Sequence, residues 1–206
     1  REALEIATLG GARALGRDGG GYTLGRLGMA TGLDVFNPTG RGARDASRGD
    51  GDPTAALVRA SAEREQALVG PYSLFARIEG QYASQPLFSS QEFALGGTTF
   101  GRGYDPSEAL GDDGVGATLE LRRSDRVTLG GLDLGLTVFG FADYGRVWNK
   151  GQGVPEANEL VSFGLGLRAQ ITQRAELGLT LAQPMEELQR DGSDDPRLFF
   201  AAQFRF

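Results

Sequence analysis

Alternation of apolar and polar residues is the main pattern in the second half of the chain. A period of two is the spacing of side chains on one face of a β-strand. In residues 115–122, one set of alternating positions is Val115, Ala117, Leu119 and Leu121, and the other is Gly116, Thr118, Glu120 and Arg122. The same period continues through 134–145, 161–171, 176–181 and 197–206. Each of these segments is therefore predicted to be a strand with one apolar and one polar face.

Weaker alternation extends the strand prediction to the first half of the chain. Residues 72–82 alternate clearly, and residues 55–67, 21–36 and 2–11 are compatible with strands. This makes about nine strands, each close to the roughly 9–11 residues that a tilted strand needs to cross a bilayer. The connections alternate in length: they are short at Val69–Pro71 and at 173–174, and long and polar at 37–54, 85–113, 149–159 and 185–196.

Two architectures are compatible with amphipathic strands of this kind. A soluble sandwich would bury the apolar faces between two sheets, whereas a transmembrane barrel would turn them toward lipid. Aromatic residues near the strand ends favour the barrel, because such residues form girdles at the two membrane interfaces; they are Tyr72, Tyr82, Tyr144, Trp148, Phe204 and Phe206. The expected fold is therefore all-β, a transmembrane antiparallel β-barrel of the outer membrane.

The strand count has a consequence for closure of this barrel. With both ends of the barrel chain on the periplasmic side, the long connections would lie outside the cell and the short ones in the periplasm. An odd number of strands does not close an ordinary bacterial barrel, and open edges in lipid would leave backbone groups unpaired. We therefore expect further strands before Arg1 or from a partner chain.

Composition excludes several classes of function. The chain has 206 residues, no cysteine, no histidine and a net charge of -6. The negative charge argues against a nucleic-acid partner, and the lack of histidine and cysteine excludes histidine-based triads and zinc sites. We expect no enzyme activity, no catalytic residue, no metal and no cofactor. Asp112-Asp113 and Asp194-Asp195 are interpreted as solvated loop charges, Glu79 and Glu120 as solvated pore lining, and Arg48-Gly49-Asp50 as a chance tripeptide.

A glycine-rich segment with a single arginine interrupts the strands, at Gly96–Asp105. It belongs to a connection too long for a hairpin turn, and Phe100 and Tyr104 within it predict packing against other residues. An arginine inside a narrow lumen needs acceptors, and a guanidinium can grip a carboxylate through two parallel hydrogen bonds. Asp143 would face the same lumen, so a loop folded inward with Arg102 paired to Asp143 is expected. Gly101 and Gly103 would permit the tight backbone, and Tyr104, Phe139 and Phe141 would shield the pair. The alternative is a solvated loop arginine and an unrelated lumen aspartate.

Several motifs together resemble the TpsB translocators of two-partner secretion, the hemolysin-activator and adhesin-exporter branch of the superfamily that includes BamA. They are Ser89–Gly97, Arg102-Gly103-Tyr104, Gly111–Gly114, Leu119-Glu120-Leu121, Phe141-Ala142-Asp143-Tyr144-Gly145 and the ending Pro196–Phe200 with Phe206. The segment at 141–145 is similar to the F-x-D-x-G motif of that superfamily. One departure is Gly101, where many relatives have valine before Arg-Gly-Tyr. The resemblance covers residues from about 72 to 206 well and residues 1–71 only in pattern.

The resemblance implies a domain organisation for residues 1–206. The chain would be the C-terminal portion, roughly strands 8 to 16, of a barrel of about 16 strands. The remaining strands, two periplasmic POTRA domains and a plug helix would lie outside it. Residues 85–113 would be the sixth extracellular loop, folded into the pore.

The resemblance also implies roles for single residues. Arg102, Gly103 and Tyr104 would be the motif at the tip of the loop, and Asp143, with Phe141 and Gly145, its partner on the lumen wall. Phe204 and Phe206 would belong to the C-terminal signal for barrel insertion.

The function implied is export of a large β-helical exoprotein across the outer membrane of a Gram-negative bacterium. Besides this substrate, the expected partners are outer-membrane lipid and the barrel assembly machinery. Two alternatives remain open: a BamA-like factor that assembles or inserts other barrels, and a passive porin.

Overall fold

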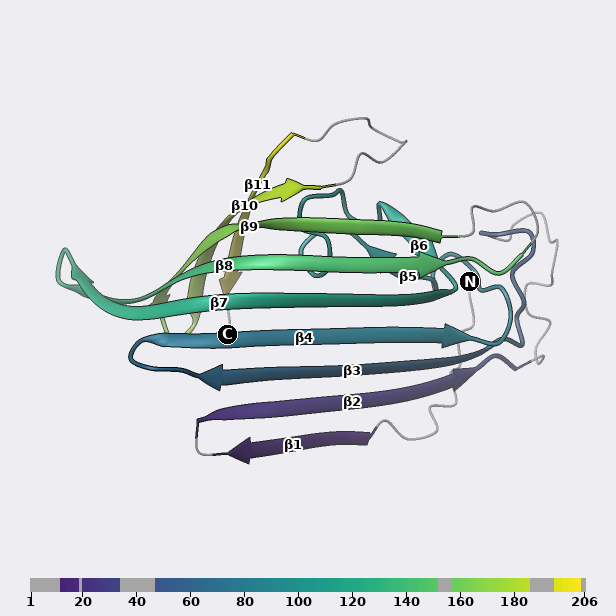
Figure 1. Ribbon diagram of the computed structural model, residues 1–206, viewed down its shortest axis with the longest axis horizontal. Coiled ribbons are helices and arrows are strands. Elements are labelled where there is room, and N and C mark those ends of the chain that lie inside the picture. The colour runs from purple at the N-terminus through teal and green to yellow at the C-terminus, as the bar shows by residue number, and fades with distance from the viewer. Residues whose placement is uncertain (1–11, 19, 34–46, 152–156, 186–194, 205–206) are drawn as a thin grey trace.

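The computed structural model describes residues 12–18, 20–33, 47–151, 157–185 and 195–204. These residues form an antiparallel nine-stranded sheet in the order β1-β2-β3-β4-β7-β8-β9-β10-β11 (Figure 1). Its strands are β1 (Ala12–Asp18), β2 (Gly21–Thr31), β3 (Ala56–Ala67), β4 (Tyr72–Ala83), β7 (Asp113–Leu129), β8 (Leu132–Trp148), β9 (Ala157–Thr172), β10 (Ala175–Pro184) and β11 (Arg197–Phe204). A second small sheet pairs β5 (Phe93–Leu95) with β6 (Ala109–Gly111). The all-β antiparallel prediction is confirmed.

Two strand boundaries differ from the prediction. β7 and β8 continue as a hairpin well beyond Arg122, to a turn at Gly130-Gly131 with φ values of 60° and 84°. Positive φ at both central residues is the geometry of a tight hairpin turn, and glycine adopts it without strain. Strong alternation stops near Arg122 because polar residues then occupy both faces of the strand. The strand expected at 2–11 lies outside the described residues, and β1 begins at Ala12 instead.

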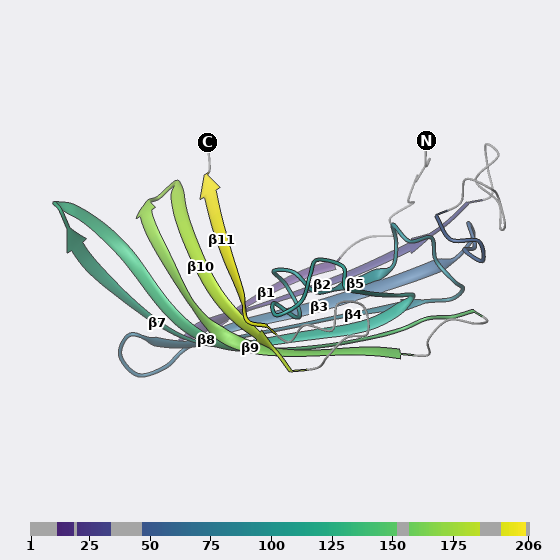
Figure 2. The same ribbon diagram turned by 90° about the horizontal axis from the view of Figure 1, so that it is seen from above.

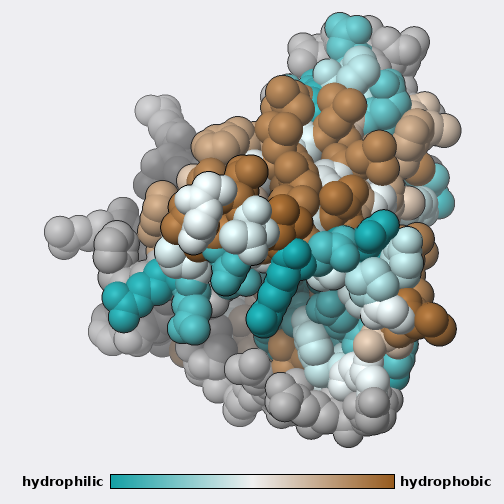
Figure 3. Space-filling view, turned by 90° about the vertical axis from the view of Figure 1, so that its left-hand side faces the viewer, coloured by the Kyte–Doolittle hydropathy of each residue, from teal (hydrophilic) through white to brown (hydrophobic). Residues whose placement is uncertain are grey.

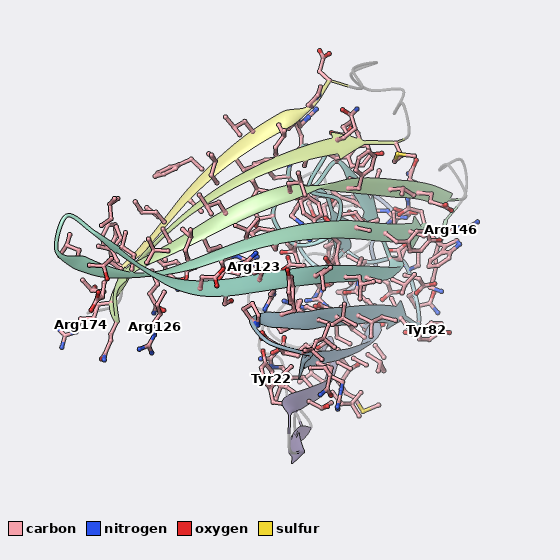
Figure 4. All side chains as sticks on the ribbon, turned by 60° about the vertical axis from the view of Figure 1, so that its left-hand side comes forward. Tyr22, Tyr82, Arg123, Arg126, Arg146 and Arg174 are labelled. Atoms are coloured by element: carbon pink, nitrogen blue, oxygen red, sulfur yellow. The ribbon has the colours of Figure 1, made fainter. Side chains whose placement is uncertain are left out.

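Connections of different length lie at opposite ends of the large sheet. The β3–β4, β7–β8 and β9–β10 connections are tight turns at one end. The connections β2–β3, β4–β7 and β8–β9 meet at the other end, which we call the long-loop end (Figure 1). Tyr82 and Arg146 lie toward this end, and Arg126 and Arg174 lie toward the opposite end (Figure 4).

The two faces of the sheet differ in polarity. The sheet is curved, and the β4–β7 connection lies on its concave side (Figure 2). On β7 the polar set of residues faces this side: Glu120 is 3% exposed, whereas its apolar neighbour Leu119 on the convex side is 49% exposed. Figure 3 shows hydrophobic residues gathered over a contiguous area of the surface, beside hydrophilic ones. Such an inverted arrangement is that of a sheet with an apolar face turned toward lipid.

The sheet has two edge strands, β1 and β11, and among the described residues these do not pair with each other. The described residues also include no helix that is long and apolar enough to span a membrane.

Candidate functional site

The site is built around the connection between β4 and β7, residues 84–112, which we call the central loop. Its bounds lie one residue before the expected 85–113, because β4 ends at Ala83 and β7 begins at Asp113. β5 and β6 pair across its base, from Phe93 with Gly111 to Leu95 with Ala109. Beyond them the chain turns back on itself through a bridge between Gly96 and Phe100. The loop therefore has a paired root and a compact tip.

The tip places the side chain of Arg102 among polar residues of β7 and β8. Its Nε donates to Asp143 Oδ2 at 2.8 Å and its Nη2 donates to Asp143 Oδ1 at 2.7 Å. Nη1 donates to Glu120 Oε1 at 2.6 Å, and Nη2 also donates to Thr118 Oγ1 at 2.7 Å. The backbone N–H of Arg102 donates to Asp143 Oδ2 at 3.0 Å. The guanidinium lies over the ring of Phe141, with its Cζ 3.6 Å from the ring centre. We call Arg102, Thr118, Glu120 and Asp143 the Arg102 cluster.

The two carboxylates of the Arg102 cluster differ in what else they bind. Glu120 also accepts from Arg122, at 2.7 Å, and from Arg168, at 3.3 Å. Asp143 has one further partner in the cluster, the hydroxyl of Thr118 at 2.5 Å. Glu120 is thus a buried member of an ion-pair network, and the interpretation of it as solvated pore lining is wrong. The signal for this in the sequence was Arg122, two positions along and therefore on the same face of the strand as Glu120.

Ser162 completes a polar row across the sheet at this level. It pairs with Asp143 in the register of β8 and β9, as Thr118 does in the register of β7 and β8. Ser162 is fully buried, and its Oγ has no hydrogen-bond partner among the described residues. A buried hydroxyl without a partner costs free energy, so Ser162 is a site of local strain in the wall beside Asp143.

An apolar cluster fills the space between the central loop and the wall. It consists of Phe93, Leu95, Phe100, Tyr104, Ala109, Val147 and Leu160. The Tyr104 hydroxyl donates to the backbone carbonyl of Val161 at 2.9 Å, which draws its ring toward β9. Phe139 and Phe141 pack in another cluster, with Ala182. Of the rings expected to shield the Arg102–Asp143 pair, Phe141 lies over the guanidinium and Tyr104 is buried in the apolar cluster.

Glycines of the wall make room for this cluster. A Cβ on Gly116 would lie 2.5 Å from the Phe100 ring, and one on Gly145 would lie 2.5 Å from the Leu95 side chain. At the tip, Gly101 has a φ of 84°, and a Cβ on Gly103 would lie 2.7 Å from the backbone N of Pro184. Gly103 is thus required for close approach to β10, and Gly145 for seating the loop.

A second polar cluster lies at the long-loop end, around Arg48 of the β2–β3 connection. Its Nη1 donates to Glu92 Oε1 at 2.7 Å and to Asp112 Oδ1 at 2.8 Å. Its Nε donates to Asp50 Oδ1 at 2.7 Å, and its Nη2 donates to the carbonyl of Lys150 at 2.7 Å. We call Arg48, Asp50, Glu92 and Asp112 the Arg48 cluster.

Asp112 is the centre of this cluster. Its side chain is fully buried, and it also accepts from the backbone N–H groups of Leu87 and Lys150, both at 2.6 Å. The neighbouring Asp113 pairs with Lys150 at 2.5 Å. The interpretation of Asp112-Asp113 as solvated loop charges is therefore wrong, because three connections converge on these carboxylates. Nothing local in the sequence marks this convergence.

Burial and neighbouring charges shift the ionisation of the Arg48 cluster. Burial raises the pKa of the Glu92 carboxyl, the negative charge of Asp112 raises it further, and Arg48 opposes both. Burial alone would lower the pKa of Arg48, but hydrogen bonds with Asp50 and Asp112 and their charges outweigh it and raise that pKa. Arg48 is therefore held charged, and burial favours the protonated form of Glu92.

The remaining predicted site residues lie at the chain end. Phe204 is exposed on the edge strand β11, and Phe206 lies outside the described residues. Asp194 also lies outside them, and Asp195 is exposed. No group of three or more carboxylate, histidine or cysteine residues within the described ranges is arranged to hold a metal ion.

Comparison with known proteins identifies the family. A search of curated proteins finds no match to the chain. The profile of the family described as haemolysin secretion/activation protein ShlB/FhaC/HecB matches residues 10–169. The match includes the central loop, the Arg102 cluster and the Arg48 cluster. Members of this family are outer-membrane β-barrels of Gram-negative bacteria that serve in protein translocation. The chain therefore belongs to the ShlB/FhaC/HecB family, the TpsB proteins of two-partner secretion.

Proposed function

We propose that this protein exports a large partner exoprotein of β-helical type across the outer membrane, and that the central loop controls the passage. The family supports the class of transport. The position of the loop supports its role, because it occupies the concave face of the sheet, where an exported chain would pass (Figure 2). Passage of an unfolded polypeptide then requires the loop tip to move.

The observation that carries this proposal is the set of contacts made by Arg102. One guanidinium of the loop bonds to three side chains of the wall, two on β7 and one on β8. All of these side chains are buried. Removing one partner of a buried ion pair costs about 3–5 kcal/mol because the other charge is left buried without compensation, so loss of Arg102 or of Asp143 should undock the tip.

The same cluster is arranged for release. When Arg102 leaves, Glu120 keeps Arg122 and Arg168 as partners. Asp143 alone loses its cation, and Thr118 remains with it. The free-energy cost of withdrawing the tip thus falls on Asp143 rather than on all the polar residues of the wall.

The orientation of the sheet follows from the same role. We place the long-loop end outside the cell and the tight turns in the periplasm, as in other outer-membrane barrels. The edges of β1 and β11 would be paired with further strands in the assembled translocator, because unpaired strand edges are not stable in lipid.

Secretion by variants of the full-length translocator tests the proposal. Arg102→Ala and Asp143→Ala should abolish export of the partner exoprotein, while heat-modifiable migration shows that the barrel still assembles. Arg123→Ala is the matched control, since Arg123 forms an exposed ion pair with Asp125 at 2.8 Å, far from the loop. Normal export by both cluster variants would refute the role given to the Arg102 cluster, and diffusive conductance without any exported partner would favour a porin.

A further inference from the structure

We propose that the Arg48 cluster is a second anchor of the central loop, and that it holds the root at the long-loop end while the tip moves. Arg48, Glu92 and Asp112 would be positioning residues, which act on transport through the loop. The inference goes beyond the docking of Arg102 and rests on the proposed role of the loop as the moving element.

The Arg48 cluster binds the central loop on either side of the β5–β6 pair. Glu92 immediately precedes β5 and Asp112 immediately follows β6. The same Nη1 of Arg48 bonds to both carboxylates, at 2.7 and 2.8 Å. A single guanidinium from the β2–β3 connection therefore bonds to both sides of the root, where β5 and β6 are already paired.

The root is attached to neighbouring connections through Asp112. Asp112 joins the β2–β3 connection through Arg48 and the β8–β9 connection through the N–H of Lys150. Two further bonds join the β2–β3 connection to the root region: Asp52 N–H donates to the Pro86 carbonyl at 2.8 Å, and Ser89 N–H donates to Ser47 Oγ at 3.2 Å. The root is thus bonded to two other connections, in addition to the apolar packing of Phe93 and Leu95 against the wall.

The two anchors use different polar residues. The side chains that bind Arg102 and those that bind Arg48 have no residue in common. The polar contacts of the two anchors are therefore separate, and among the described residues root and tip are joined only through the apolar cluster and the backbone between them. The glycines with positive φ in the loop, Gly96, Gly97 and Gly101, lie between the root and Arg102. The backbone rotation that a moving tip requires can be absorbed there without disturbing β5 and β6.

The Arg48 cluster holds buried charges. Arg48 faces three carboxylates, and two of them, Glu92 and Asp112, have side chains exposed by 7% and 0%. Lys150 directs its ammonium group to Asp113. Loss of Arg48 would leave Glu92 and Asp112 buried without the cation they share. The root would therefore separate from the β2–β3 connection.

Two distances measured in the full-length protein test the inference. Because this chain has no cysteine, spin labels can be placed on introduced cysteines at the exposed residues Ala94, in the root, Thr99, in the tip, and Thr128, at the far end of β7. Double electron–electron resonance then measures the Ala94–Thr128 distance, which reports the root, and the Thr99–Thr128 distance, which reports the tip.

Each anchor should control its own label. Arg48→Ala should raise the displaced population of the Ala94 label about tenfold or more, the effect of losing one hydrogen bond to a charged group, and leave the Thr99 label in place. Arg102→Ala should displace the Thr99 label by a comparable factor and leave the Ala94 label in place. Arg48→Met keeps an apolar side chain of similar length and should displace the Ala94 label as the alanine variant does. Arg48→Lys keeps the charge and should displace the label less. Arg123→Ala should change neither distance.

Three outcomes would overturn the inference: both labels moving together in either variant, the Ala94 label staying in place without Arg48, or full rescue by Arg48→Met, which would show a packing role. The distances are read without secretion. A failure here is therefore distinct from a failure of the proposed transport function, which the export assay measures.

Discussion

The two carboxylates that bind Arg102 are predicted to contribute unequally to docking of the tip. Asp143→Asn and Glu120→Gln each remove one negative charge with little change in shape. Asp143 accepts two side-chain hydrogen bonds from Arg102, at 2.8 and 2.7 Å, and Glu120 accepts one, at 2.6 Å. Glu120 keeps two further arginines as partners. Docking should therefore depend more on Asp143.

The difference can be given a magnitude. The amide introduced by Asp143→Asn has one acceptor oxygen where the carboxylate has two, so one of the two side-chain hydrogen bonds from Arg102 is lost. Asp143→Asn should therefore cost about 1.5–3 kcal/mol, a shift of about 10- to 150-fold toward the withdrawn tip. Glu120→Gln should cost about 1–1.5 kcal/mol, a shift of about 5- to 10-fold.

The spin-label pair at Thr99 and Thr128 measures both shifts. A urea series brings each variant through a range in which docked and withdrawn tips are both populated, and linear extrapolation gives the ratio without urea. Equal shifts for the two variants, or a larger shift for Glu120→Gln, would refute the assignment of Asp143 as the main partner of Arg102.

Three further predictions follow from other contacts. Gly116→Ala should weaken docking by about 1–3 kcal/mol, because its Cβ would meet the Phe100 ring at 2.5 Å; Gly140→Ala, where the nearest atom is at 3.5 Å, should leave the tip distance unchanged. The raised pKa of Glu92 means that the docked root binds a proton more tightly than a withdrawn root, so root stability should rise as pH falls through that pKa. Glu92→Gln should abolish the pH dependence of the Ala94–Thr128 distance. A distance that lengthens on acidification in the wild-type protein would contradict the prediction. Leu165→Arg on the lipid side should destabilise the barrel by about 2–4 kcal/mol in urea unfolding from bilayers, and Leu165→Met should not; equal stability would contradict the orientation of β9.

The pairing of Arg102 with Asp143 shows how far local pattern reaches. Alternation assigns Asp143 to the polar face of its strand, and the glycine-rich tip with one arginine is visible without any structure. The further partners of the arginine are harder to foresee, because Thr118 and Glu120 are only two of many polar residues with the same parity. Which of them meets the tip depends on strand register, and the register of β7 with β8 runs on to Gly130-Gly131 rather than ending near Arg122.

The packing of Tyr104 depends on tertiary structure for a related reason. Parity places Phe139 and Phe141 on the concave face, and this is where they lie. The direction in which the tip leans is decided by the hydrogen bond from Tyr104 to Val161 on β9 and by the approach of Gly103 to Pro184. Neither contact has a signature in the sequence, because each joins residues that are far apart along the chain.

Sequence alone determined the strands, their two faces and the nature of the tip, because a period of two, turn glycines and a lone arginine are local features. Tertiary structure alone decided the Arg48 cluster. Arg48 and Asp112 are 64 positions apart, and both were interpreted from sequence as unremarkable loop residues. They meet because antiparallel strands bring every second connection to one end of the sheet, and only the folded loops determine which charges are buried there.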